Sequence, residues 1–161
     1  MSEEQFVIFR LGSQDYGLPI AAVDEIARLP DQVSRLPKAP KFIEGVINLR
    51  GLVVPIVDLR KRFDIAGGSS GEARRILVLS VGGQKTGFLV DSVSEVAKVA
   101  SDAIQTAPSV SEEQQRLIGR VANIDERMIL LVDPAKLLDR IEADLLAKFG
   151  RSQAEKELSA S

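Results

Sequence analysis

The 161-residue chain contains no cysteine and no histidine. Without cysteine, disulfide bonds, thiolate metal sites and cysteine nucleophiles are excluded, and nothing in the composition indicates an oxidising compartment. Without histidine, the chain lacks the side chain most often used for proton transfer near neutral pH, the commonest metal ligand and the usual phosphate acceptor of bacterial phosphorelays. We therefore expect a protein that is not an enzyme and that holds no cofactor or metal.

The chain also lacks an excess of positive charge and any long apolar run. Its formal net charge is −2 and its pI is about 5.3, which argues against nucleic acid or an anionic membrane as a partner. The longest apolar runs are short, such as 128–132, well below the roughly 18 residues of a membrane span. The acidic start has no basic region followed by an apolar core. We expect a cytoplasmic protein without direct membrane insertion.

Two stretches of the sequence are similar to each other. Residues 6–30 align with 76–100 at a constant offset of 70 (76 minus 6), which matches Gly12 with Gly82, Gln14 with Gln84, Gly17 with Gly87, Val23 with Val93, Glu25 with Glu95 and Ala27 with Ala97. Residues 47–59 align with 122–134 at an offset of 75 (122 minus 47). The chain is therefore interpreted as a duplicated module of roughly 70 residues, with repeat one at about 6–63 and repeat two at about 76–138.

Short apolar runs closed by turn residues predict strands and hairpins. The predicted strands are 6–11, 16–20, 42–49, 52–57, 76–81 and 86–90. Pro55 indicates an edge or bulge position within one of them. Apolar residues at 20, 23 and 26, and again at 90, 93 and 96, recur every third position, which fits a helical turn better than a strand.

Helices are expected mainly near the end of the chain. Residues 136–149 have helical periodicity and Gly150 ends them, while Ser111 and Gln114 predict a short capped helix at 112–117. Asp58 and Asp133 each end an apolar run, where a carboxylate can cap the first turn of a following helix.

These patterns predict a mostly β protein of two small β-barrels packed together, with a C-terminal helix. Residues 5–148 would form one domain of two interleaved β-barrel subdomains, the loop 66–72 would join the two repeats, and 151–161 would be a flexible tail.

The block Ala-Pro-Lys-Phe-Ile-Glu-Gly-Val-Ile-Asn-Leu-Arg-Gly-Leu-Val-Val-Pro-Ile-Val-Asp-Leu-Arg-Lys-Arg-Phe at 39–63 resembles the signature of CheW-type chemotaxis adaptor domains. The segment 16–26 is similar to the family's Gly-Ile-x-Ile-x-x-Val-x-Glu-Ile segment, and the similarity covers about residues 5–148. The resemblance implies two five-stranded barrels of the Src-homology-3 kind. It also implies an adaptor that joins the regulatory domain of the histidine kinase CheA to the cytoplasmic tip of a methyl-accepting chemoreceptor, recruited to membrane receptor arrays.

The resemblance also suggests which residues contact each partner. Val23 and Glu25 correspond to positions at the contact with the kinase regulatory domain. The receptor-coupling region corresponds to the turn and its approach, at Gly45, Asn48, Arg50 and Gly51. The alignment places Asp125 opposite Arg50, so we expect only the first copy to carry this arginine. Val23 matches Val93 and Glu25 matches Glu95, so packing and a solvated turn charge stay open as structural explanations.

Three further interpretations remain to be tested. The same fold could serve a surface-motility or second-messenger pathway in place of flagellar taxis. A small β-barrel hydrolase would use Asp58 and Asp133 as acid and base, which requires the two carboxyl groups to converge. The basic residues are expected to form a solvated face, with possible charge complementarity to an acidic partner; they are Arg60, Lys61, Arg62, Arg74 and Arg75.

Overall fold

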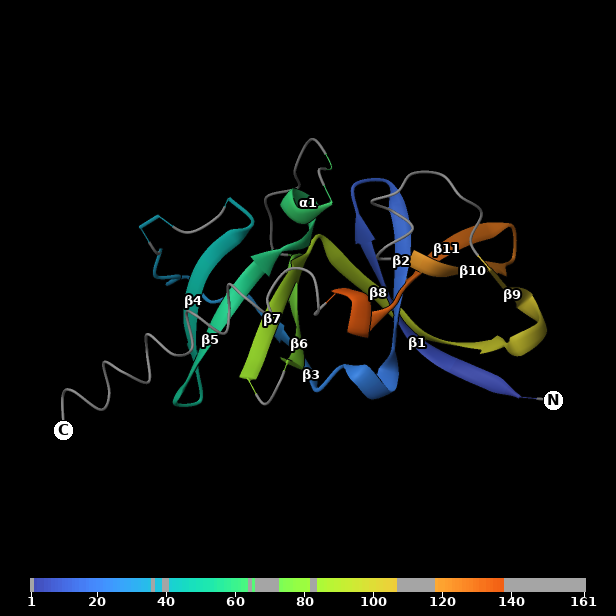
Figure 1. The fold of residues 1–161 in the computed structure, drawn as a ribbon, viewed down its shortest axis with the longest axis horizontal. Helices are drawn as coiled ribbons and strands as arrows, with labels where there is room; N and C mark the ends of the chain where they lie inside the picture. The colour runs from blue at the N-terminus through green and yellow to red at the C-terminus, as the bar shows by residue number, and fades with distance from the viewer. Residues whose placement is uncertain are drawn as a thin grey trace.

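The computed structural model describes residues 2–35, 37–38, 41–63, 65, 73–81, 84–106 and 118–137. Within these residues the chain forms eleven β-strands, two 3-10 turns, the short helix α1 and a helical segment at 134–137 (Figure 1). The first half contributes β1 (Glu3–Leu11), β2 (Gln14–Pro19), η1 (Ile20–Ala22), β3 (Glu25–Arg28), β4 (Ile43–Leu49), β5 (Leu52–Asp58) and α1 (Leu59–Arg62). The second half contributes β6 (Arg75–Val81), β7 (Gln84–Val90), β8 (Ser92–Ala100), η2 (Ser101–Ala103), β9 (Ile104–Thr106), β10 (Ile118–Ile124) and β11 (Arg127–Val132).

The strands form two sheets that lie side by side in Figure 1. The six-stranded sheet has the order β8-β1-β2-β11-β10-β9, and the five-stranded sheet has the order β3-β6-β7-β5-β4. A backbone bridge between Ser34 and Val46 links the segment after β3 back to β4, at the other end of the five-stranded sheet. The expected mostly β fold with two barrels is confirmed, and the short strand β9 gives one sheet a sixth strand.

Each sheet contains strands from both copies of the repeat. Strands β1 and β2 of the first copy join the second copy's β8 to β11, through the parallel pairing of β2 with β11. Strands β6 and β7 of the second copy join the first copy's β3 to β5, through the parallel pairing of β5 with β7. Because each barrel is completed by strands from the other half, neither copy can form its barrel from its own residues.

Three buried clusters make up the core of the described part of the chain. One lies in the six-stranded sheet around Phe6 and Ile8, and a second lies in the five-stranded sheet around Ile56 and Ile76. The third and largest contains residues of both sheets, including Phe9 on β1, Phe88 on β7 and Leu137. Alternate side chains of β6 therefore enter different clusters: Ile76 and Val78 pack within their own sheet's cluster, whereas Leu77 and Leu79 join the shared one.

The predicted hairpins are present, but the every-third-residue pattern was misleading. Residues 90, 93 and 96 belong to β7 and β8, and only Ile20–Ala22 in the first copy forms a 3-10 turn. Strand β8 pairs with β1 from Ala100 to Ser92, and this long-range ladder outweighs the weak local helical spacing. Pro55 lies neither on an edge strand nor at a bulge: β5 is flanked by β4 and β7, and the β5–β7 ladder begins only at Ile56.

Several expected segments lie wholly or partly outside the described residues, namely 66–72, 112–117, most of 136–149 and 151–161. Residues 134–137 are helical, and the amide of Leu137 donates to the carbonyl of Asp133 at 2.9 Å. No helix in the described part of the chain is long and apolar enough to cross a membrane.

Candidate interaction site

The β4–β5 hairpin presents Arg50 at its tip. Leu49 pairs with Leu52, so Arg50 and Gly51 form a two-residue turn with φ values of +53° and +87°. Positive φ at both turn residues is the geometry that matches the twist of an antiparallel hairpin. The amide of Gly51 donates to Oδ1 of Asn48 at 2.8 Å, which stabilises the turn. The side chain of Arg50 is 72% exposed.

Arg50 forms an ion pair with Glu25. A guanidinium nitrogen of Arg50 donates to Oε1 of Glu25, the first residue of β3. The Glu25 side chain is 24% exposed, so it is less accessible than the arginine that covers it. The structure thus brings together two residues that the family resemblance assigned to different partners.

The second copy repeats this ion pair with a different arginine. Its hairpin turn is Asp125-Glu126, also at positive φ, and the next residue, Arg127, donates to Oε1 of Glu95 at 3.1 Å. Arg127 also donates to Oδ2 of Asp15 from Nε and a terminal nitrogen, at 3.3 and 3.2 Å. Its hydrogen bonds raise the pKa of Arg127 above the ordinary value, and the bond to Glu95 contributes more than the bonds to Asp15.

Only the first copy carries an arginine at the hairpin tip, as expected, but the second copy makes the equivalent contact from Arg127, the first residue of β11. Alignment by turn position compared Arg50 with Asp125 and missed Arg127, two residues further along the chain. The sequence did contain a signal for this contact. Glu25 and Glu95 match at the repeat offset of 70, and a carboxylate present in both copies suggests a cation near each. A long, flexible arginine can reach such a carboxylate from more than one place in the hairpin.

Gly45 is required by the backbone around it. Its φ is +150°, and a Cβ atom there would lie 2.4 Å from the carbonyl oxygen of Ser34. The neighbouring Val46 exchanges two 2.9 Å backbone hydrogen bonds with Ser34, so this oxygen is held in place. A structural reason for the glycine is thus present, while its part in receptor coupling stays a prediction.

Val23 and Asp24 position the start of β3. Val23 is half-buried against the cluster shared by both sheets, as is its counterpart Val93. Oδ2 of Asp24 accepts from Oγ of Ser80 at 2.6 Å and from Nζ of Lys85 at 3.2 Å. These hydrogen bonds lower the pKa of Asp24, and the bond from Ser80 contributes more than the bond from Lys85. These contacts tie the residue before Glu25 to β6 and β7.

Exposed apolar side chains flank both members of the Glu25–Arg50 pair. Ile26 follows Glu25 and is 42% exposed, while Leu52 and Val53 follow the Arg50-Gly51 turn and are 52% and 42% exposed. Apolar area beside a polar, charged group is the usual make-up of a surface that binds another protein.

The two aspartates proposed as an acid and base instead cap helices. Oδ1 of Asp58 accepts from the amides of Arg60 and Lys61 at 3.0 and 3.4 Å. Oδ1 of Asp133 accepts from Ala135 and Lys136 at the same two distances. The matching geometry gives each carboxylate the same structural role in its own repeat, which removes the argument for a catalytic pair.

The basic group does not form the solvated face that was expected. Arg60 is only 16% exposed and pairs with Asp91 at 3.1 Å, and Lys61 pairs with Glu44 at 3.1 Å. The guanidinium of Arg62 lies 6.0 Å from the ring centroid of Phe42. Arg60 lies on α1 and reaches Asp91, the residue between β7 and β8.

Comparison with known proteins agrees with this fold. Residues 5–142 match the CheW-like domain family. The chain belongs to that family. It is 42% identical over 151 residues to the chemotaxis protein CheW of Klebsiella aerogenes, covering 92% of this chain and 90% of the relative. It is 34% identical over 143 residues to a probable chemotaxis protein CheW of Rhizobium etli, covering 88% and 92%.

A solved structure is also similar to this CheW-like domain. The scaffolding protein TtCheW of Thermoanaerobacter tengcongensis superposes with a TM-score of 0.76 at 34% sequence identity, covering 83% of this chain and 86% of that one. The resemblance found in the 39–63 block is therefore confirmed over nearly the whole chain.

Proposed function

We propose that this protein is a non-enzymatic adaptor that couples chemoreceptors to the histidine kinase CheA in a chemotaxis signalling array. The observation that carries the proposal is the family match over 5–142, supported by relatives named chemotaxis protein CheW and by a similar structure described as a scaffolding protein. We also propose that residues 5–148 form a single domain made of two interleaved β-barrel subdomains. The protein would act in the cytoplasm, at the membrane receptor arrays.

The surface is large enough for two partners at once. The accessible area is 9640 Å², and two standard contact patches of about 800 Å² per partner would use roughly a sixth of it. The adaptor would act without chemistry of its own, by letting the conformation of a receptor bias the kinase. Such coupling between sites is typically about 1–3 kcal/mol.

We assign the two contacts to the two sides of the Glu25–Arg50 pair. Val23 and Glu25 would contact the kinase regulatory domain, and the hairpin residues Gly45, Asn48, Arg50 and Gly51 would contact the receptor tip. Because Arg50 binds Glu25 directly, a receptor that draws Arg50 away would change the charge that Glu25 presents to the kinase. The ion pair gives the two proposed surfaces a direct physical connection.

The test is reconstitution with a CheA-type kinase and receptor-bearing membranes. We expect Glu25→Lys to weaken kinase binding by calorimetry and Arg50→Ala to reduce receptor-dependent kinase activation, with little change in melting temperature. The matched control is Glu95→Lys, which breaks the equivalent pair in the other sheet. A second control, Arg127→Ala, also removes the hydrogen bonds to Asp15, so its melting temperature is measured alongside. If Glu25→Lys still binds the kinase fully and Arg50→Ala still supports full activation, the assignment of these surfaces is wrong. If the wild-type chain binds neither the kinase nor the receptor, the proposed function is wrong.

The alternative of a surface-motility or second-messenger pathway has no specific support. The curated relatives described above carry the name chemotaxis protein.

A further inference from the structure

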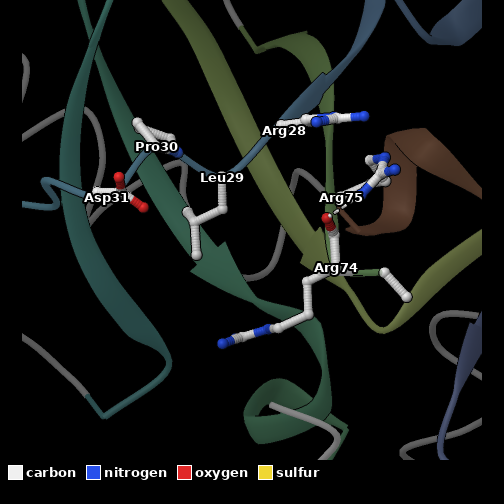
Figure 2. A pocket seen from close by; sticks show the side chains of 7 residues that line it. Arg28, Leu29, Pro30, Asp31, Arg74 and Arg75 are labelled. Carbon is white, nitrogen blue, oxygen red and sulfur yellow. Dashed lines mark hydrogen bonds between the residues drawn. The ribbon is translucent and has the colours of Figure 1, made fainter. Parts of the chain in front are cut away.

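A cleft lies where β3 ends and β6 begins, away from the Glu25–Arg50 pair along β3 (Figure 2). Its volume is about 840 Å³, within the range of about 300–1,000 Å³ that is usual for small-molecule sites. The lining residues are Arg28, Leu29, Pro30, Asp31, Ala73, Arg74 and Arg75. Three cations and one carboxylate thus surround the space, which favours an anionic occupant.

Two of these arginines lie directly opposite each other. Arg28 pairs with Arg75 in the β3–β6 ladder, and Figure 2 shows both side chains pointing to the same side of the cleft. Arg74 points the other way in Figure 2 and approaches Asp58 at 3.9 Å. The two strands therefore bring two guanidinium groups to directly opposite positions at the cleft.

The duplicated fold shows that the barrel does not require the arginine pair. The repeat offset of 70 matches Arg28 with Lys98 and Arg75 with Gln5. In the six-stranded sheet these two counterparts, Lys98 and Gln5, pair with each other in the same register. Glu4 occupies the position that matches Arg74. The same scaffold is therefore built once with a neutral residue opposite the cation and once with two opposed cations. A ligand needed at only one of the two places accounts for that difference.

We propose that this cleft binds a small molecule carrying a phosphate group, with Arg28 and Arg75 holding the phosphate. This site is separate from the adaptor function proposed above. Arg75 donates to the carbonyl of Arg74 at 2.8 Å, which orients its guanidinium, and a guanidinium has five N–H donors that match phosphate oxygens in pairs. Leu29, Pro30 and Ala73 offer apolar contact to the rest of the ligand. Asp31 offers an acceptor for a ligand hydroxyl or amino group.

The test uses calorimetric titration of the whole protein with pyrophosphate and with ATP at low salt. We expect saturable binding that raises the melting temperature, and Arg28→Gln should weaken it by about tenfold or more, because bidentate contacts from arginine to phosphate are among the strong ones. The matched control is Lys98→Gln, at the equivalent place in the other sheet, which should bind as the wild type does. Without ligand, Arg28→Gln should be about as stable as the wild type, because Arg28 is exposed at the surface.

Four outcomes would overturn the proposal. The proposal fails if neither pyrophosphate nor ATP binds at millimolar concentration. It also fails if Arg28→Gln and Lys98→Gln weaken ligand binding equally. A ligand-free Arg28→Gln protein clearly less stable than the wild type would show that Arg28 has a structural role instead. Co-sedimentation with phosphatidylglycerol vesicles distinguishes a lipid headgroup from a soluble phosphate: vesicle binding without pyrophosphate binding would also contradict the small-molecule site.

Discussion

Arg50, at the tip of the β4–β5 hairpin, binds the carboxylate of Glu25 at the start of β3. The other repeat makes the same kind of contact between Arg127 and Glu95. A pair that recurs in both copies has a structural component, whereas its position beside exposed Ile26 and Leu52 suits a contact surface. Stability and partner binding must therefore be measured separately for these residues.

Breaking the Glu25–Arg50 pair should cost little folding free energy. Ion pairs at this level of exposure contribute about 0.2–1 kcal/mol, so Glu25→Ala, Arg50→Ala and the double variant should give a coupling energy in that range by urea denaturation. The exchange Glu25→Arg with Arg50→Glu should restore the coupling but not partner binding, because each partner then meets the wrong charge. Restored kinase and receptor binding in the exchanged variant would mean that the pair matters only for its internal contact.

Replacing Gly45 should destabilise the protein more than replacing Gly51. A Cβ at Gly45 would lie 2.4 Å from a fixed backbone oxygen, whereas nothing lies within 4 Å of one at Gly51. Gly51→Ala carries only the cost of its left-handed φ, about 1–2 kcal/mol, and Gly45→Ala should exceed it in chemical denaturation. If the two variants lose equal stability, the close approach to Ser34 is relieved by backbone adjustment. Receptor coupling at this hairpin is best tested with Gly51→Ala, which changes the fold least.

Thr86→Val should stabilise the protein. Thr86 is fully buried on β7, and its hydroxyl oxygen has no hydrogen-bond partner in the described part of the chain. Valine keeps the shape and removes the unpaired polar atom, so we expect a gain of about 1 kcal/mol in the free energy of unfolding. Thr86→Ser is the matched control, because it keeps the hydroxyl and loses a methyl group, and it should be destabilised. A loss of stability in Thr86→Val would indicate that the hydroxyl has a partner after all.

Asp24 should stabilise the fold in a pH-dependent way. Hydrogen bonds from Ser80 and Lys85 lower its pKa in the folded state, while an unfolded aspartate titrates near about 3.9. A depressed folded pKa adds stability above the unfolded value, and this stability is lost as pH falls through the folded pKa. The deficit of Asp24→Asn relative to the wild type should be present at pH 7 and shrink below about pH 3.9. A deficit that is the same at both pH values would rule out the carboxylate charge as its source.

Local patterns in the sequence were sufficient for the hairpins, the caps and the family. The turn at Arg50-Gly51 and the capping roles of Asp58 and Asp133 depend on residues a few positions apart, so their residue types predict them. The duplication also follows from the sequence, because repeated glycines and carboxylates keep their spacing. The block at 39–63 was specific enough to indicate the family without the fold.

The partners of each strand depended on the tertiary structure. The exchange of strands between the two barrels rests on the parallel pairings of β2 with β11 and of β5 with β7, which join segments far apart in the chain. Register across such pairings is set by packing of the shared core and leaves no local pattern to read. For the same reason, the contact of Arg127 with Glu95 and the opposition of Arg28 to Arg75 became visible only once the strands were paired.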